Sequence, residues 1–340
     1  MNRGAASTEA IPRPARPRAL GRTGGYVAAL AVLLVALPFI PQVPPFQRIL
    51  LSYGLIAGIT ALAFNLLLGY TGLLSFGHSA FFGTAAYTTA FSMRYLGLTS
   101  MEAFLAAGFL SSLLVAVVFG VVCVRYTRIF FSILALALSQ VLWGLAIKLF
   151  WITGGTDGIR VPTPMLLGGL LGAPQDKLTF LATTYYYYVL AVFALCVGAM
   201  WLIVHSPFGK ALQAVRDNEV RAEFVGVPVR AYRLVAFVLS GAFTGVAGAL
   251  WAPLNGHVTP DVLYWPFSGR IVFMTVLGGF QSFVGPLVGA AVFNHLEAYA
   301  VGYATYWQAV LGMVLVLLVL TMPTGLIGAG ARLAARLRRT

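Results

Sequence analysis

Long apolar runs separated by short breaks of Gly, Pro or charged residues dominate the chain. Runs of about 20 apolar residues are typical of helices that cross a bilayer about 30 Å thick. We therefore predict an all-α fold, a polytopic transmembrane helical bundle with broken, Gly-rich helices. The predicted spans are residues 26–41, 47–69, 73–93, 102–124, 129–151, 185–204, 234–252, 266–279, 284–301 and 303–322.

Composition supports a membrane location. Of the 340 residues 60% are apolar and only 9% are charged, whereas soluble domains carry about 25% charged residues. A soluble fold of this length would need more polar surface to cover its core. The solvent of most of this chain is therefore expected to be lipid.

The net charge of +13 is distributed as in a membrane protein, not as in a nucleic-acid-binding domain. Sixteen of the 22 Lys and Arg residues lie beside apolar spans, in four clusters: Arg3 to Arg22, Arg125 with Arg128, Lys210 to Arg233, and Arg332 to Arg339. Basic residues mark the cytoplasmic side of membrane proteins. Both termini and the loop 205–233 are thus expected in the cytoplasm, and the loop 152–184 outside; no nucleic-acid partner is expected.

The same rule helps with the span count. Residues 266–301 can be interpreted as two spans or as one long helix broken at its glycines. Nine spans would leave the C-terminal arginines outside, so we predict ten.

The chain divides into three regions. Residues 1–25 are rich in Pro and Arg and are expected to be a disordered basic cytoplasmic tail. Residues 26–322 form the transmembrane domain, and 323–340 form a second basic cytoplasmic tail. A cleaved signal peptide is the alternative for the first span, but several prolines follow it without a small-x-small cleavage site, which favours a retained helix.

The inner loop is polar yet has the signals of structured helices. Ser206 followed by Pro207 is a helix start, Asn218 can start a second turn, and Gly226 with Pro228 is a stop. Apolar side chains interrupt the polar sequence of the loop at Leu212, Val215, Val220 and Phe224. Three interpretations are open: a helix on lipid headgroups, an ordinary loop, or a helix docked on a soluble partner. The interspersed acids disfavour anionic lipid, so docking is preferred.

Four motifs resemble LivM-type permeases of branched-chain amino acid ABC transporters. They are Asn65-Leu-Leu-Leu-Gly-Tyr-Thr-Gly-Leu-Leu-Ser-Phe-Gly-His-Ser-Ala-Phe-Phe-Gly-Thr-Ala-Ala-Tyr87, Thr153-Gly-Gly-Thr-Asp-Gly158, Pro207-Phe-Gly-Lys-Ala-Leu-Gln-Ala-Val-Arg-Asp-Asn-Glu219 and Leu277-Gly-Gly-Phe-Gln-Ser-Phe-Val-Gly-Pro-Leu-Val-Gly289. They occur in the order of that family over about residues 50–325.

The resemblance implies a heteromeric importer in a bacterial plasma membrane. Its other parts would be two cytoplasmic ATPases, a second homologous permease and an extracytoplasmic solute-binding protein. It also implies that the inner loop holds the helix that couples ATPase closure to the membrane domain. The residues that match this role are Gly209, Leu212, Val215, Arg216, Asp217, Asn218, Glu219 and Gly226.

Candidate residues for solute and binding-protein contact each have a structural alternative. Asn65, Ser75, Gly77 and His78 are candidates for the translocation pathway, but His78 among small residues is more often an interhelical hydrogen bond. Thr156 and Asp157 of the outer loop are candidates for contact with a binding protein, although the default interpretation is a glycine-rich turn in which Asp157 caps its own backbone.

The chain lacks the residues needed for ATP binding or for catalysis in the membrane. The chain has no phosphate-binding Gly-x-x-x-x-Gly-Lys-Ser/Thr loop and no cluster of His, Asp or Glu for a membrane enzyme, so no catalytic residue, metal or cofactor is expected. His295 and Glu297 are two residues apart, which puts them on different helix faces. Lys148 and Arg270 are expected to extend to a membrane boundary. An ATP-driven importer permease is preferred, and a secondary transporter or channel is the alternative.

Overall fold

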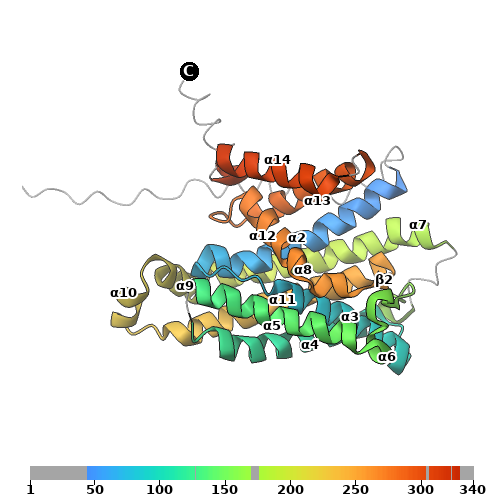
Figure 1. The fold of residues 1–340 in the computed structure, drawn as a ribbon, viewed down its shortest axis with the longest axis horizontal. Coiled ribbons are helices and arrows are strands. Elements are labelled where there is room, and N and C mark those ends of the chain that lie inside the picture. The colour runs from blue at the N-terminus through green and yellow to red at the C-terminus, as the bar shows by residue number, and fades with distance from the viewer. Residues whose placement is uncertain (1–43, 127, 170–175, 304–305, 323, 330–340) are drawn as a thin grey trace, which may run out of the picture. The chain divides into compact units, whose positions relative to one another are not determined.

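The computed structural model describes residues 44–126, 128–169, 176–303, 306–322 and 324–329, and these are largely helical (Figure 1). The helices are α2 (Pro45–Thr71), α3 (His78–Leu96), α4 (Met101–Cys123), α5 (Arg128–Lys148), α6 (Phe150–Thr153), α7 (Lys177–Ala182), α8 (Thr184–His205), α9 (Pro207–Asp217), α10 (Glu219–Phe224), α11 (Val229–Asn255), α12 (Trp265–Gly278), α13 (Gly285–Tyr303) and α14 (Trp307–Thr321). Short elements join them: 3-10 turns η2 (Gly155–Asp157), η3 (Leu167–Gly169) and η4 (Pro260–Leu263), and strands β1 (Ile159–Arg160) and β2 (His257–Val258).

The predicted helical class is confirmed. Nine of the predicted spans coincide with helices of the described residues. The first predicted span and the tail 1–25 lie outside the described residues, as does most of 323–340. Within the described part, five helical segments are long and apolar enough to cross a membrane: Pro45–Thr71, Met101–Cys123, Ile129–Lys148, Lys177–His205 and Val229–Asn255.

The core lies where α11 packs against α2, α3 and α4. Its centre is a set of aromatic rings: Phe81 of α3 meets Phe237 of α11 at 5.3 Å between centroids, and Phe131 of α5 meets Phe237 at 5.6 Å, both edge to face. All three side chains are fully buried. Edge-to-face ring pairs contribute stabilisation beyond that from the apolar area they bury, so these contacts hold α3, α5 and α11 together.

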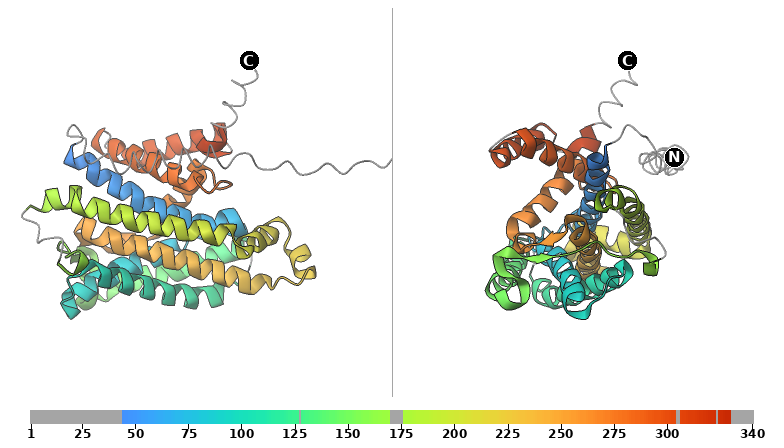
Figure 2. Two further views of the ribbon diagram at one scale, coloured as in Figure 1. Left: turned by 180° about the vertical axis from the view of Figure 1, so that it is seen from behind. Right: turned by 90° about the vertical axis from the view of Figure 1, so that its right-hand side faces the viewer.

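The two predicted loops lie at opposite ends of α8. The segment 177–182 precedes this helix and α9 follows it, and its 22 residues span about 33 Å. Figures 1 and 2 accordingly show α9 and α10 at one end of the bundle, and α6, α7 and β2 at the other. We call these the α10 end and the β2 end.

At the β2 end, the loop 152–184 is attached to the segment that follows α11. Strands β1 and β2 pair antiparallel, with Ile159 opposite Val258. The turn before β1 requires glycine, because Gly154, Gly155 and Gly158 all have positive φ. The glycine-rich motif thus shapes the turn that leads into β1.

Helix α7 is capped by Asp176, whose carboxylate accepts hydrogen bonds from Thr179 and Leu178. These bonds lower the pKa of that carboxyl.

Residues 265–303 form two helices that fold back on each other, not one broken helix. An added Cβ at Gly289 of α13 would lie 1.9 Å from the Met274 carbonyl oxygen of α12, and one at Gly278 would lie 1.8 Å from that of Gly285. Because the later residue of α12 (Gly278) meets the earlier residue of α13 (Gly285), the two helices run antiparallel. Glycine is therefore required at this crossing because the two backbones touch.

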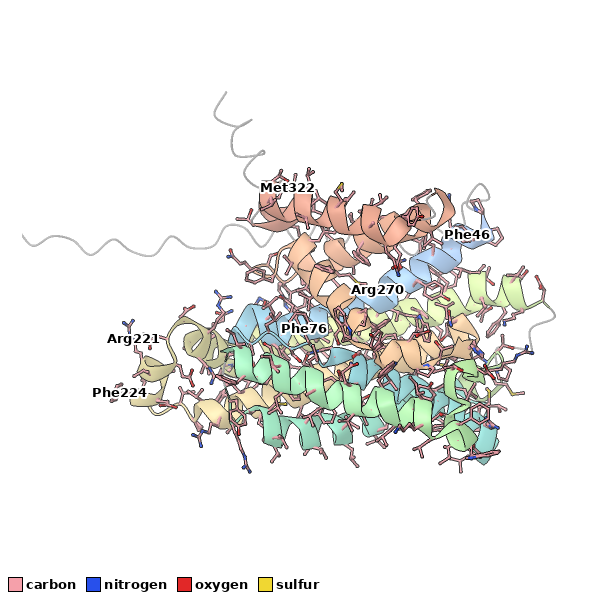
Figure 3. The ribbon with its side chains drawn as sticks, in the orientation of Figure 1. Phe46, Phe76, Arg221, Phe224, Arg270 and Met322 are labelled. Carbon is pink, nitrogen blue, oxygen red and sulfur yellow. The ribbon has the colours of Figure 1, made fainter. Side chains whose placement is uncertain are left out.

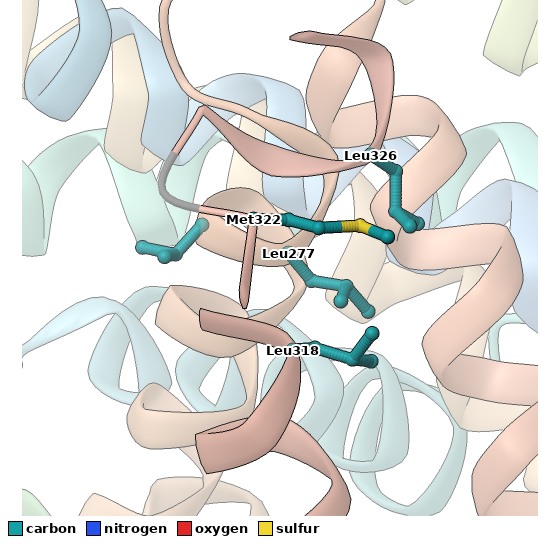
Figure 4. A pocket seen from close by; sticks show the side chains of 5 residues that line it. Leu277, Leu318, Met322 and Leu326 are labelled. Carbon is teal, nitrogen blue, oxygen red and sulfur yellow. The ribbon is translucent and has the colours of Figure 1, made fainter. Parts of the chain in front are cut away.

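The same region contains a small apolar pocket, lined by Val276 and Leu277 of α12 and by Leu318, Met322 and Leu326 (Figure 4). Its volume is about 10 Å³, which is no more than one water molecule needs. It is too small to hold an amino acid and is a packing defect between α12 and the C-terminal segment.

Candidate functional site

The inner loop folds as two capped helices, as predicted. The Ser206 hydroxyl accepts from Gly209 N at 3.5 Å at the start of α9, and the Asn218 side chain accepts from Arg221 N at 2.9 Å at the start of α10. Gly226, with φ of +89°, ends the element. A helix of 11 residues is marginal in water, so its packing against the bundle decides its position.

One face of α9 is buried against this chain. Leu212 is fully buried in the cluster formed with α4 and α11, and Val215 packs with Ala222 and Val229. Gly209 lies against the Val204 carbonyl, where a Cβ would come within 2.1 Å. The apolar side chains that the sequence offered for docking are therefore divided, and Leu212 and Val215 belong to the interior.

Polar side chains join the two helices to the bundle. Arg216 donates from Nη1 to the carbonyl oxygen of Gly69 on α2. Glu219 forms a two-point ion pair with Arg233 of α11, at 2.7 and 2.8 Å. Asp217 is exposed. Both Arg216 and Glu219 therefore hold the loop in place, whereas the sequence suggested only contact with a partner.

The outer surface of α10 is apolar at its tip. Val220, Phe224 and Val225 are 61%, 88% and 77% exposed, and Figure 3 shows Phe224 and Arg221 at the extreme α10 end of the bundle. An exposed Phe beside exposed Val residues forms an apolar patch, and covering such a patch with a partner is energetically favourable. We call these three residues the α10 tip.

The candidate pathway residues lie around a non-helical segment, residues 72–77, inside the bundle. The predicted span 73–93 is helical only from His78. Serine side chains replace the missing helix hydrogen bonds: Ser132 donates to the Leu74 carbonyl at 2.5 Å, and Ser75 accepts from Gly77 N at 3.3 Å. Irregular backbone at membrane depth needs such partners.

The side chains of this region are turned inward. His78 is fully buried, and its Nε2 lies 2.8 Å from the Ser240 hydroxyl, which donates to the Ala63 carbonyl at 2.6 Å. Asn65 is also fully buried, and its Nδ2 donates to the Ser282 carbonyl at 3.5 Å. Gly77 faces the Ala135 backbone. The His78 contact is an interhelical hydrogen bond, the structural alternative expected for that residue, whereas Asn65 bonds to the turn between α12 and α13.

Thr156 and Asp157 lie exposed at the β2 end, in the turn η2. The Asp157 carbonyl is 2.6 Å from Nε2 of His257, next to the β1–β2 pair. The turn is therefore anchored through its backbone while both side chains face outward.

Comparisons with known proteins agree with this arrangement. The chain matches the family described as branched-chain amino acid transport system / permease component over residues 48–320. The chain belongs to this family. It is 28% identical over 322 residues to the permease protein LivM of the high-affinity branched-chain amino acid transport system of Escherichia coli K12, covering 89% of this chain and 74% of LivM. No solved structure matches it.

Two further relatives are also permease proteins of high-affinity branched-chain amino acid transport systems. This permease is 25% identical over 281 residues to LivH of Salmonella typhimurium, covering 79% of this chain and 90% of LivH, and 24% identical over 294 residues to BraD of Pseudomonas aeruginosa, covering 82% and 93%. Its relatives are transport components and not enzymes, and it is a multi-pass membrane protein. Among the described residues no three His, Cys, Asp or Glu side chains gather as metal ligands.

Sequence reasoning missed one charged contact of the permease. The sequence predicted that Arg270 extends to a membrane boundary and gave it no ionic partner. In the structure its Nη1 lies 2.9 Å from Oε1 of Glu297 on α13. Both residues fall inside predicted spans, on either side of the 279–284 turn. Opposite charges at similar distances from a tight turn between two apolar segments were the signal that could have found this contact.

Proposed function

We propose that this chain is one of two permease subunits of an ATP-driven ABC importer in a bacterial inner membrane. The solute is a branched-chain amino acid or a related small polar molecule, which an extracytoplasmic binding protein delivers. Two separate ATPase subunits supply the energy, because the chain has no phosphate-binding loop of its own. Membership of the family and likeness to both LivM and LivH support this proposal.

The proposal includes an orientation. The α10 end carries Lys210, Arg216, Arg221, Arg230 and Arg233 in and beside α9 and α10. Lys and Arg mark the cytoplasmic side of the membrane. We therefore assign the α10 end and both termini to the cytoplasm, and the β2 end, with Thr156 and Asp157 as the contact for the binding protein, to the outside.

The observation that carries the coupling role is the α10 tip. Its three side chains are exposed beside Ala222, which packs against Val215 of α9 and Val229 of α11, so the tip presents an apolar surface at the end assigned to the cytoplasm. Burying Phe224 alone in a partner would contribute about 1.5–3 kcal/mol. We assign this surface to a groove of the ATPase, with Asp217 and Arg221 at its rim.

Contacts behind the tip connect it to the membrane helices. Arg216 bonds to the backbone of α2 at Gly69, and Asn65, one turn earlier on α2, bonds to the turn between α12 and α13. A displacement of α9 by the ATPase would therefore reach α2 and the α12–α13 hairpin without a flexible link. In this arrangement Arg216, Asn218 and Glu219 transmit the force rather than contact the ATPase.

The test is Phe224→Asp in the assembled transporter. Loss of a central apolar anchor costs about 2–4 kcal/mol of association free energy, so the ATPase subunits should co-purify poorly with the tagged permease and ATP-dependent uptake should fall. Leu96→Asp is the matched control, because Leu96 is 71% exposed at the C-terminus of α3. Normal co-purification and uptake in Phe224→Asp would exclude the tip as the coupling surface. Uptake driven by a proton gradient without ATP would instead indicate a secondary transporter.

A further inference from the structure

The Arg270–Glu297 ion pair joins α12 to α13, and both residues fall within predicted spans. Thr275, five residues after Arg270 on α12, donates to the Ala61 carbonyl at 3.3 Å, and Asn294, three residues before Glu297 on α13, donates to the Leu50 carbonyl at 3.0 Å. The ion pair therefore lies along the N-terminal half of α2. This is the half nearer the β2 end, and Figure 3 places Arg270 well away from the α10 tip.

This ion pair is partly open at the surface of the chain. The Arg270 side chain is 39% exposed and that of Glu297 is 18% exposed. Charged side chains facing hydrocarbon are costly, and those retained within spans face protein or a water-filled cavity. The face of α12 and α13 that carries the ion pair is therefore turned away from lipid.

We propose that this face lines the translocation pathway and that the ion pair is the binding site for the two charges of a zwitterionic amino acid. The proposal rests on the importer function proposed above. The guanidinium of Arg270 binds the solute carboxylate, for which its planar donors are suited. The carboxylate of Glu297 accepts from the solute ammonium.

The two side chains exchange partners as the solute passes. Without solute they neutralise each other at 2.9 Å, so neither is left as an unpaired charge in a low-dielectric site. A zwitterion replaces this one ion pair by two, and its departure restores the original contact. A solute with only one charge would break this ion pair and form only one in its place, so the site selects for zwitterions.

Neutral and reversed variants separate solute binding from a structural tie between α12 and α13. In proteoliposomes containing the complete transporter with solute-loaded binding protein, Arg270→Gln and Glu297→Gln should each lower uptake of radiolabelled leucine by about tenfold to a hundredfold, as loss of one charged hydrogen bond does. ATP hydrolysis stimulated by the binding protein should persist. The double variant Arg270→Glu with Glu297→Arg restores an ion pair but inverts it, and should not restore uptake.

Restored uptake in the reversed double variant would show that the ion pair is a structural tie, and normal uptake in both neutral variants would exclude any role in transport. If wild-type vesicles show no ATP-dependent uptake, the importer function itself fails.

A second measurement leaves the ion pair intact, in case the variants do not fold. Val301 lies one turn from Glu297 on the same face of α13 and is 55% exposed. In Val301→Cys a charged, membrane-impermeant thiol reagent should react from the outer side, and leucine should slow the reaction. Leu114→Cys on α4, where Leu114 is 65% exposed on an apolar helix, should stay unreactive in lipid. The native Cys123 and Cys196 are buried and give little background. An unreactive Val301→Cys overturns the proposal.

Discussion

Removing the carboxylate of Glu219 should release α10 from the bundle. Arg233 is the residue that makes this contact costly to break, because its side chain is only 6% exposed and its Nε is buried without a hydrogen-bond partner. Glu219 meets it at two points, at 2.7 and 2.8 Å. In Glu219→Gln the guanidinium stays buried beside a neutral amide.

The expected cost follows from the exposure of the two side chains. Breaking a fully buried ion pair costs about 3–5 kcal/mol, whereas a fully exposed pair contributes about 0.2–1 kcal/mol. The Glu219 side chain is 39% exposed while that of Arg233 is buried, so water can reach only one partner. We expect about 2–3 kcal/mol, nearer the buried limit.

Hydrogen exchange of the amides in residues 218–228 measures this cost directly. A loss of about 2–3 kcal/mol raises the population of the open loop about 30- to 150-fold. Removing both charges, as in Glu219→Gln with Arg233→Met, should recover most of the loss because no buried charge remains. Glu223→Gln, an exposed acid on the same helix, is the control. Equal exchange in Glu219→Gln and Glu223→Gln, or a double variant no more protected than the single one, would refute this reasoning.

Two further predictions address packing and orientation. Gly289→Ala should lower the thermal midpoint of the purified protein by an amount equivalent to about 1–3 kcal/mol, because its Cβ would lie 1.9 Å from the Met274 carbonyl and α12 and α13 must separate; Gly302→Ala on the same helix meets nothing within 4 Å and should be silent, so equal midpoints would contradict the close crossing. In Gln213→Cys, an impermeant thiol reagent should label the exposed α9 only in inside-out vesicles, and labelling of intact cells would reverse the proposed orientation.

Much of this protein could be predicted from local sequence patterns. Apolar runs determine helices because a bilayer leaves the backbone no other hydrogen-bond partners, and nine of the predicted spans coincide with described helices. Capping is equally local, since Ser206 and Asn218 each accept from an amide three residues away. For the same reason the two short helices of the inner loop were predictable.

Tertiary structure decided which side of each element faces inward. Leu212, Val215 and Phe224 are all apolar residues of the same polar loop. The first two are buried and the third is 88% exposed, because α9 packs on the bundle and α10 extends beyond it. The partners of His78 and Asn65, which are Ser240 on α11 and Ser282 in the turn between α12 and α13, likewise follow from packing and not from the local sequence.

The charged contacts also depend on long-range packing. Glu219 meets Arg233, and Arg270 meets Glu297, only because a turn folds one helix back on another. Residue spacing along the chain determines neighbours within a helix through the 3.6-residue period, but it says nothing of the distance between two helices. The sequence alone therefore determined the class of protein and the position of its helices, while the assignment of each polar side chain to structure, coupling or solute binding required the packed fold.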